Sequence, residues 1–527
     1  MWGITPTFWS PPMRKTAAVA AFALLTAGCG SSPSAEQPAT GTGTFTVALA
    51  ADPGVLDPAM GVLSATNTAL SVAYESLVTV GEDGKTAPGL AEKWEIKPDS
   101  VTFTLRKDIT CSDGSKLTPA DVADNVNHIV NPDTKSPIYG VLIPAGMKAT
   151  SDATSVTLST PEPFGFILQS AQNLLVVCGK GVKDRSLLAK STYGTGPFAL
   201  SEAVAGDHYT FSLRKDYSGS TDGLPGKVVV KIVPNEQTAA NLMMSGAINN
   251  ATFFGPDRAR VEAIPGVTKE VIAPTNAQYF YHQGEGRPGA DPEVRKALTQ
   301  ALNLPELAGI VSSNTGKPAT GLVSEPRPCP GDTVTGHVTP TDPAAAASGL
   351  EAAGWKAGAD GIRAKDGKKL SLRVLYATTR GPGFQAAAEY MAATWKKVGA
   401  EVTLNGVIDT KLAESLNVTQ DWDVAWLPIG VTLPTQLVGF LSGPAAPKGA
   451  NFAHLNNQRY TELVAQAAGT PGDAGCKLWS EAESALFDNH DLVPVSGLTI
   501  LIASKGGTVR QVAGFYQPTT FRLTQGG

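Results

Sequence analysis

The chain has 527 residues, of which 42% are hydrophobic and 17% charged, with 55 glycines and 38 prolines. It is long enough for two or three domains, and its composition is that of a loop-rich globular protein rather than a disordered chain or a coiled coil. The formal net charge of −5 argues against a nucleic-acid partner, which would require a basic stripe.

The N-terminus contains a short apolar run. Residues 13–29 read MRKTAAVAAFALLTAGC, with two cations before the run and small residues before Cys29. The run is too short to span a bilayer permanently. The segment resembles a lipoprotein signal peptide, which implies a signal peptide over residues 1–28, lipidation of Cys29 and a flexible tether over 29–43 that holds the protein at the cell membrane. Plain secretion with cleavage nearby is the alternative.

The stretch 101–130 predicts a strand, a turn and a helix. Apolar and threonine residues alternate over 101–105, which is typical of a strand with one buried face. Ser112-Asp113-Gly114 favours a turn. Thr118 can cap a helix that begins with Pro119, and an apolar stripe then follows at helical spacing.

The same stretch, VTFTLRKDITCSDGSKLTPADVADNVNHIV, resembles a signature segment of the family 5 extracellular solute-binding proteins. These are the oligopeptide- and dipeptide-binding components of ABC importers. Further blocks follow in the family's order over roughly residues 44–505: YESLV at 74–78, YGTGPF at 193–198, DPEVRKAL at 291–298, DWDV at 421–424 and LVPV at 492–495. The ordered set carries the resemblance rather than any one block.

The resemblance implies an α/β fold of the type II periplasmic-binding-protein class, with two ligand lobes, a hinge and an inserted extra domain. The expected parts are ligand lobe I (44–76 with 194–278 and 491–527), the inserted domain (77–193) and ligand lobe II (279–490).

Cysteine usage fits an exported protein. Apart from Cys29 there are four cysteines, Cys111, Cys178, Cys329 and Cys476, without a CxxC pair. Four cysteines allow three pairings. The domain division implied by the resemblance favours Cys111–Cys178 and Cys329–Cys476, because each pair then stays within one domain. Four buried free thiols are the alternative.

No catalytic set is recognisable. The sequence has no GxSxG elbow and no HExxH motif, and its six histidines are scattered without ligand spacing. We therefore expect a binding protein rather than an enzyme, with no cofactor and no metal site. A secreted hydrolase, and a receptor for a sensor or chaperone, are the alternative functions.

The resemblance also suggests ligand-binding residues. Trp426 stands where peptide-binding relatives have a tryptophan in the pocket wall, and Arg380 lies near the arginine that binds a ligand carboxylate. Phe254 and Tyr281 belong to aromatic clusters at strand spacing. Ile429 occupies the position of the aspartate that pairs with a peptide's α-ammonium.

A buried ammonium without a counter-charge is costly, so Ile429 makes a free-amine peptide less expected and leaves sugars, opines and metal chelates open. By resemblance, we expect a monomeric extracytoplasmic receptor that closes on a small solute, peptide or peptide-like, and delivers it to an ABC transporter permease.

Overall fold

The computed structural model describes residues 41–61, 64–81, 85–255, 257–325, 327–512 and 514–524. The expected signal peptide, Cys29 and most of the tether lie outside these residues. In the described part of the chain, no helix combines the length and apolar character needed to cross a membrane.

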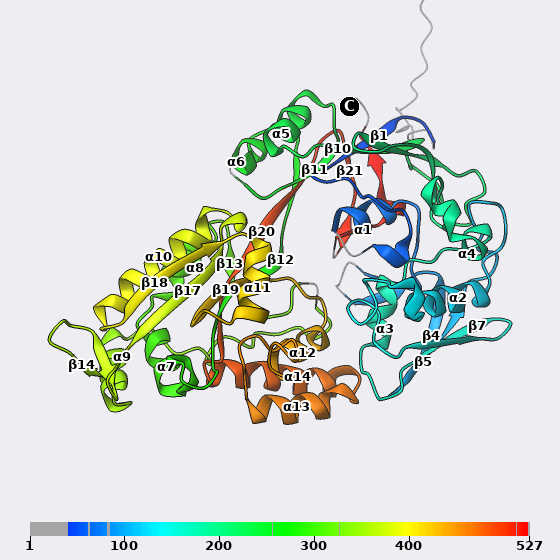
Figure 1. Cartoon of the computed structure of the whole chain (residues 1–527). Coiled ribbons are helices and arrows are strands. Elements are labelled where there is room, and N and C mark those ends of the chain that lie inside the picture. The colour runs from blue at the N-terminus through cyan, green and yellow to red at the C-terminus, as the bar shows by residue number, and fades with distance from the viewer. Residues whose placement is uncertain are drawn as a thin grey trace, which may run out of the picture. The chain divides into compact units, whose positions relative to one another are not determined.

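One mixed sheet runs through both expected ligand lobes (Figure 1). Its strands are, in spatial order, β18 (Glu401–Val407), β17 (Ser371–Ala377), β19 (Val424–Ile429), β12 (Thr268–Tyr281), β20 (Leu492–Ser504), β11 (Asn250–Phe253), β1 (Thr44–Leu49), β10 (Lys227–Ile232), β9 (His208–Leu213) and β8 (Phe198–Val204), and β13 (Lys317–Pro318) also pairs with β20. The long antiparallel strands β12 and β20 join the two halves of this sheet.

The pairing of β12 with β20 is interrupted in its middle. The register shifts between Ile272 and Thr275 and again between Ala277 and Gln278. A register shift disrupts the hydrogen-bond ladder locally and bends the strand. The first shift precedes the part of β12 that pairs with β19, which begins at Asn276, and the second lies within that part. We therefore place the hinge at residues 272–278 of β12.

Helices of the second lobe cover the sheet on the side of Trp426. They are α7 (Pro292–Gln300), α8 (Leu304–Val311), α9 (Pro343–Ala352) and α10 (Pro382–Lys397). Asp291 caps α7, and Pro292 occupies the first helical position. Trp395 of α10 is fully buried, and its indole donates to the Leu298 carbonyl at 2.8 Å. The apolar side chains of these four helices pack together with Trp426 and determine how the helices lie on the sheet.

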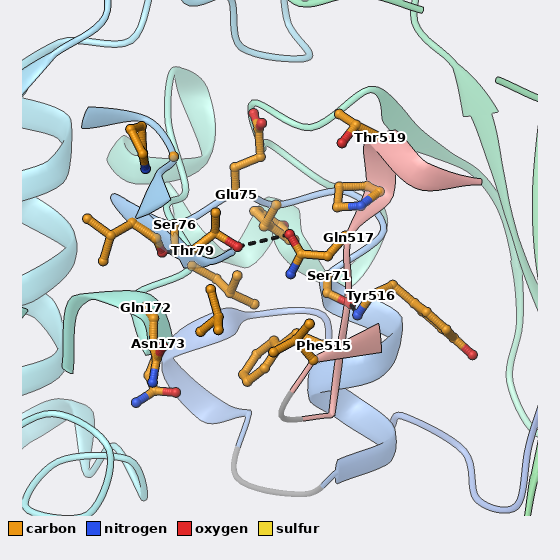
Figure 2. Close-up of a pocket in the computed structure, with 18 of the residues that line it drawn as sticks. Ser71, Glu75, Ser76, Thr79, Gln172, Asn173, Phe515, Tyr516, Gln517 and Thr519 are labelled. Carbon is orange, nitrogen blue, oxygen red and sulfur yellow. Dashed lines mark hydrogen bonds between the residues drawn. The ribbon is translucent and has the colours of Figure 1, made fainter. Parts of the chain in front are cut away.

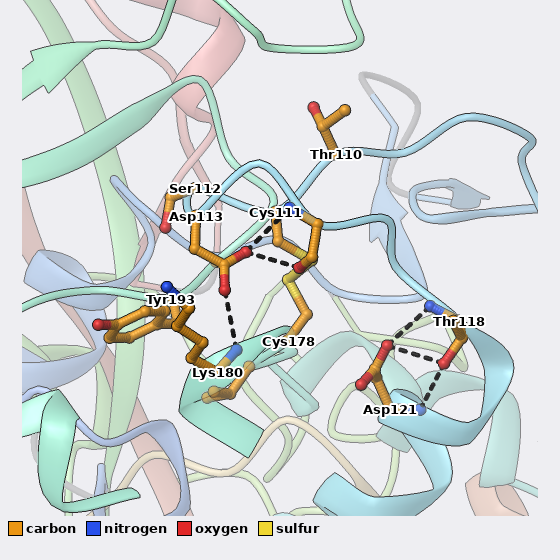
Figure 3. The surroundings of a disulfide bond; sticks show 12 residues. Thr110, Cys111, Ser112, Asp113, Thr118, Asp121, Cys178, Lys180 and Tyr193 are labelled. Carbon is orange, nitrogen blue, oxygen red and sulfur yellow. Dashed lines mark hydrogen bonds between the residues drawn. A yellow bond between two sulfur atoms is a disulfide. The ribbon is translucent and has the colours of Figure 1, made fainter. Parts of the chain in front are cut away.

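The inserted region has its own four-stranded sheet. The strand order is β4 (Ala91–Lys97), β5 (Ser100–Leu105), β7 (Ser155–Ser159) and β6 (Lys148–Ser151), and α2 (Pro119–Val130) packs against it. The predicted strand and helix of 101–130 are confirmed. Thr118 and Asp121 form a reciprocal capping box at the start of α2, visible in Figure 3.

Both predicted disulfide pairings are confirmed. Cys111 pairs with Cys178 inside the inserted region, and Cys329 pairs with Cys476 in the second lobe. Beside the first bond, the Asp113 carboxylate accepts a hydrogen bond from the Lys180 amide at 2.9 Å (Figure 3). The second bond ties an irregular segment to helix α14 (Gly472–Asp488).

The inserted region is held firmly to the first lobe by Arg214. Its buried guanidinium donates to the Gly196 carbonyl at 2.9 Å and to the Cys111 carbonyl at 2.8 Å. At Gly194, an added Cβ would lie 2.2 Å from the Ala73 carbonyl oxygen. Only glycine permits this approach of the two chain segments, which explains the YGTGPF block.

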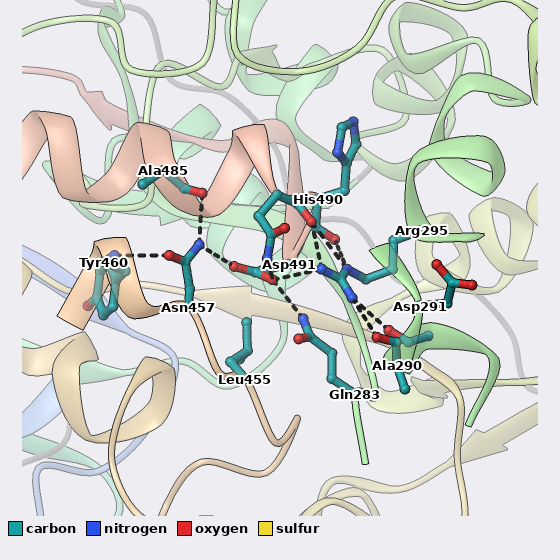
Figure 4. Close-up of polar contacts among 12 residues, drawn as sticks. Gln283, Ala290, Asp291, Arg295, Leu455, Asn457, Tyr460, Ala485, His490 and Asp491 are labelled. Atoms are coloured by element: carbon teal, nitrogen blue, oxygen red, sulfur yellow. Dashed lines mark hydrogen bonds and ion pairs between the residues drawn. The ribbon is translucent and has the colours of Figure 1, made fainter. Parts of the chain in front are cut away.

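A buried ion pair joins the ends of α7 and β20 in the second lobe (Figure 4). The side chains of Arg295 and Asp491 are 2% and 0% exposed, and their charged atoms lie 3.3 Å apart. Asn457 and Gln283 donate to the same carboxylate at 2.8 and 2.9 Å. The charges are therefore paired and hydrogen-bonded, as buried charges must be.

We predict that Asp491→Ala strongly destabilises the protein, because it leaves the Arg295 charge buried without its partner. A loss of about 3–5 kcal/mol is expected in urea unfolding followed by tryptophan fluorescence. The exposed pair Lys116–Asp108, at 70% and 78% side-chain exposure, supplies the control. Lys116→Ala, which removes the same pair, should change stability by less than about 1 kcal/mol, and an equal loss in both variants would contradict the account.

We also predict that stability falls as the pH drops from about 6.5 to about 4. Burial lowers the pKa of His282 and of His490 to about 4, so the unfolded chain binds protons in this window that the folded chain does not. Each histidine contributes up to about 3 kcal/mol to the fall. Melting temperatures measured across this window should decline less steeply in His282→Gln than in the parent protein, and an unchanged slope would contradict the account.

Candidate functional site

Two adjoining cavities lie near the hinge. The larger has a volume of about 700 Å³ and the smaller about 320 Å³, and Val80 and Gln172 line both. Their sizes are those of sites for small-molecule ligands. Together they form the candidate site.

The larger cavity borders the register break of β12. Val271, Ile272 and Ala273 line it, and Lys317 of β13 lies beside them. The inserted region supplies Phe166 and Gln169, and the second lobe supplies the start of α14 and the segment around the Cys329–Cys476 disulfide. A ligand here would touch parts of the chain on both sides of the hinge.

The smaller cavity lies between the first lobe and the inserted region (Figure 2). The Thr79 hydroxyl donates to Gln517 Oε1 at 2.9 Å, which links the β2 strand (Val78–Val80) to the C-terminal segment. Phe515 contributes apolar surface close by, whereas the Tyr516 ring points away and its hydroxyl donates to Asn250 Oδ1 at 2.7 Å (Figure 2). The lining is thus mixed, with apolar walls and a few placed polar groups.

Side-chain amides from one segment of the inserted region face the two cavities. Gln169 lines the larger, Asn173 the smaller and Gln172 both. Gln169 Oε1 and Asn173 Nδ2 are buried and have no hydrogen-bond partner among the described residues. Because unmet buried polar atoms are costly, these amides are suited to a ligand that offers both donors and acceptors, such as amide groups.

Glu75 is a buried acid at the smaller cavity. One carboxylate oxygen accepts from the Tyr217 hydroxyl at 3.2 Å and lies 4.0 Å from Arg106, while the other has no partner among the described residues. Burial, opposed by Arg106, raises the pKa of Glu75. This carboxylate is not fully compensated, and in the sequence it stands out only as part of the YESLV block at 74–78.

The charges along the larger cavity have both signs. Lys85, Lys317 and Arg327 supply cations, and Glu325 and Asp473 supply carboxylates. The Lys317 ammonium donates to the Val271 carbonyl at 3.2 Å, which places it against β12. Such a lining accommodates a ligand with both a positive and a negative group better than a strongly charged one.

Two of the five predicted ligand-binding residues lie in the core of the second lobe. Trp426 is fully buried, and its indole donates to the Met391 sulfur at 3.0 Å. Tyr281 is also fully buried, with its hydroxyl 2.9 Å from Thr299 Oγ1, and burial raises its pKa well above the usual value. Neither side chain lines the cavities.

The other three predicted residues also lie away from the two cavities. Arg380 is exposed and pairs with Asp409 at 3.0 Å, and Phe254 is 65% exposed. Ile429 ends β19 opposite Asn276. Ligand binding by these five residues remains a prediction, and the structure directs attention instead to the amide-rich segment 169–173, for which the sequence carries no motif.

Residues 85–446 match the family model of the bacterial extracellular solute-binding proteins, family 5. The match spans more than half of the chain, and the protein therefore belongs to this family of extracytoplasmic binding proteins.

Curated relatives agree with this assignment. Protein XP55 of Streptomyces lividans is 27% identical over 416 residues, covering 75% of this chain and 73% of that protein. The periplasmic murein peptide-binding protein MppA of Escherichia coli is 25% identical over 485 residues, covering 84% and 86%.

Solved structures show the same fold. The ABC transporter substrate-binding protein CtaP of Listeria monocytogenes superposes with a TM-score of 0.79 at 20% identity, over 92% of this chain and all of that one. NikA of Brucella suis, in complex with Fe(III)-EDTA, gives a TM-score of 0.75 at 22% identity, with coverage of 92% and 100%. The expected type II binding-protein fold is confirmed.

We predict that Gln172→Trp blocks ligand binding without unfolding the protein. Gln172 is partly exposed and lines both cavities, so an indole there would fill the space between them. An affinity loss of at least about tenfold, or about 1.4 kcal/mol, is expected in calorimetry. Lys97→Trp, at an exposed position of β4, is the matched control, and equal affinities for the two variants would refute the assignment.

Proposed function

We propose that the protein is the solute receptor of an ABC importer. It captures a small solute, peptide or peptide-like, by closing around the two cavities, and delivers it to a transporter permease. The observation that carries this proposal is the position of the larger cavity, which borders the register break of β12. Residues on both sides of the break line it, so a bound solute would favour the closed arrangement over the open one.

Relatives support a peptide or peptide-like solute. Their names include a murein peptide-binding protein and oligopeptide-binding proteins, and the amides of Gln169, Gln172 and Asn173 are suited to peptide groups. A metal chelate is the second candidate class, because a protein with this fold was solved in complex with Fe(III)-EDTA. A sugar or an opine is compatible with the family but has less support here.

The proposal includes attachment to the membrane through lipidated Cys29. The lipoprotein-like segment 13–29 supports it, as does a family whose members act outside the cytoplasm. A catalytic role such as hydrolysis has no support from the murein peptide-binding and oligopeptide-binding relatives, whose names describe binding proteins. We therefore propose a monomeric binding protein without a cofactor.

A thermal-shift screen of residues 35–527 tests the proposal. The panel contains peptides, oligosaccharides, opines and metal chelates. A ligand at about 100 times its dissociation constant adds about 2.7 kcal/mol of stability, which should raise the melting temperature by a few degrees. If no compound in the panel raises the melting temperature, the proposed receptor function is contradicted.

One matched pair within the panel tests the role of Ile429. It consists of the same tripeptide with a free and with an acetylated N-terminus. If the peptide lies against Ile429, which offers no counter-charge to an ammonium, the acetylated form should bind at least as well. If it lies in the larger cavity, beside Glu325 and Asp473, the free amine should bind more tightly. Tighter binding of the free amine would show that another acid, such as Glu75, takes the ligand ammonium.

A further inference from the structure

The inserted region touches the second lobe through residues 161–166. The Gly165 amide donates to the Ala468 carbonyl at 2.7 Å. Next to it, Phe166 is 5% exposed and packs into the apolar core of the second lobe, with its ring centroid 5.8 Å from that of Trp479. An aromatic ring of one part of the chain thus completes the core of another part.

The receiving surface fits this segment closely. It is the turn between α13 (Gln458–Ala468) and α14. A Cβ added to Gly165 would lie 3.2 Å from the Thr470 carbonyl oxygen, and one added to Gly469 would lie 3.0 Å from Pro163 Cβ. Glycine stands on both sides of the contact, where a larger residue would hold the surfaces apart.

A second contact joins the same two parts nearby. Gln436 Nε2 donates to the Val141 carbonyl at 2.9 Å. The same amide accepts hydrogen bonds from the Thr432 and Leu433 backbone at 2.9 Å, which fix its orientation. The contact between the inserted region and the second lobe therefore has an apolar anchor and a separate polar one.

This contact spans the hinge. Arg214 holds the inserted region to the first lobe, as does the ion pair of Arg185 with Asp57 at 2.6 Å. The inserted region and the first lobe must then move together when β12 and β20 bend. Opening of the cavities toward solvent requires Phe166 to leave the core of the second lobe, and Phe166 itself lines the larger cavity.

We propose that Phe166, with Gly165, forms a latch by which the inserted region sets the balance between open and closed receptor. The inference rests on the proposed hinge-closing function. It adds a positioning residue, Phe166, which affects affinity by holding the inserted region against the second lobe. Phe166 raises the population of the closed arrangement before any solute arrives. Apparent affinity is proportional to this population, so the latch tunes binding without recognising the solute.

The test measures the ligand-free protein, so it does not depend on the identity of the solute. Nitroxide labels are placed on Lys148→Cys in the inserted region and Gln466→Cys in the second lobe, both exposed positions. The distance distribution is then measured by pulsed electron spin resonance. Phe166→Ala should shift it to longer distances, whereas Phe166→Leu, which retains an apolar side chain, should largely restore the parent distribution.

Val418→Ala is the control, because Val418 is 68% exposed and lies in neither contact. An unchanged distribution in Phe166→Ala would overturn the latch. With any solute that the thermal-shift screen identifies, Phe166→Ala should also weaken binding, by roughly tenfold if the closed population falls tenfold. If no compound in the thermal-shift screen raises the melting temperature but the label-to-label distance in Phe166→Ala is longer, the receptor function is contradicted and the latch is supported. The two failures are therefore distinguishable.

Discussion

The structure depends on the pairing of two long strands, β12 and β20, which make one sheet out of the two ligand lobes. Backbone hydrogen bonds along this pair leave little freedom except where the register shifts, between Ile272 and Thr275 and after Ala277. Strands β18, β17 and β19 follow β12 on one side of the sheet, and β11, β1, β10, β9 and β8 follow β20 on the other. The larger cavity borders it, so the place where the protein can bend is also a place where a solute can bind.

Buried polar groups make each side of the break rigid. Arg214 donates to carbonyls of both the first lobe and the inserted region, and Arg295 with Asp491 joins α7 to β20 in the second lobe. Such groups are costly to expose or to leave unpaired, so the parts keep their internal structure when the hinge moves. Contacts that cross the break, such as that of Phe166 with Trp479, then determine how far the receptor closes.

The sequence predicted what depends on local chemistry. The cap at Thr118, the proline start of α2 and the strand at 101–105 follow from neighbouring residues, and the disulfide pairs follow from the family's domain order. The burial of Trp426 in the core of the second lobe did not follow from the sequence. Its strand is evident, but the face on which the indole lies is set by β12 and α10. The amides of Gln169 and Asn173 were missed because the cavities combine segments far apart in sequence.

A crystal structure of the protein with bound solute, compared with one of the free protein, tests the central claim most directly. The account predicts that each lobe superposes on itself and that backbone torsion changes are confined to the register break of β12 and the facing residues of β20. The solute would lie in the larger cavity against Ile272. A solute bound elsewhere, or a closure produced by rearrangement inside one lobe with β12 and β20 unchanged, would contradict it.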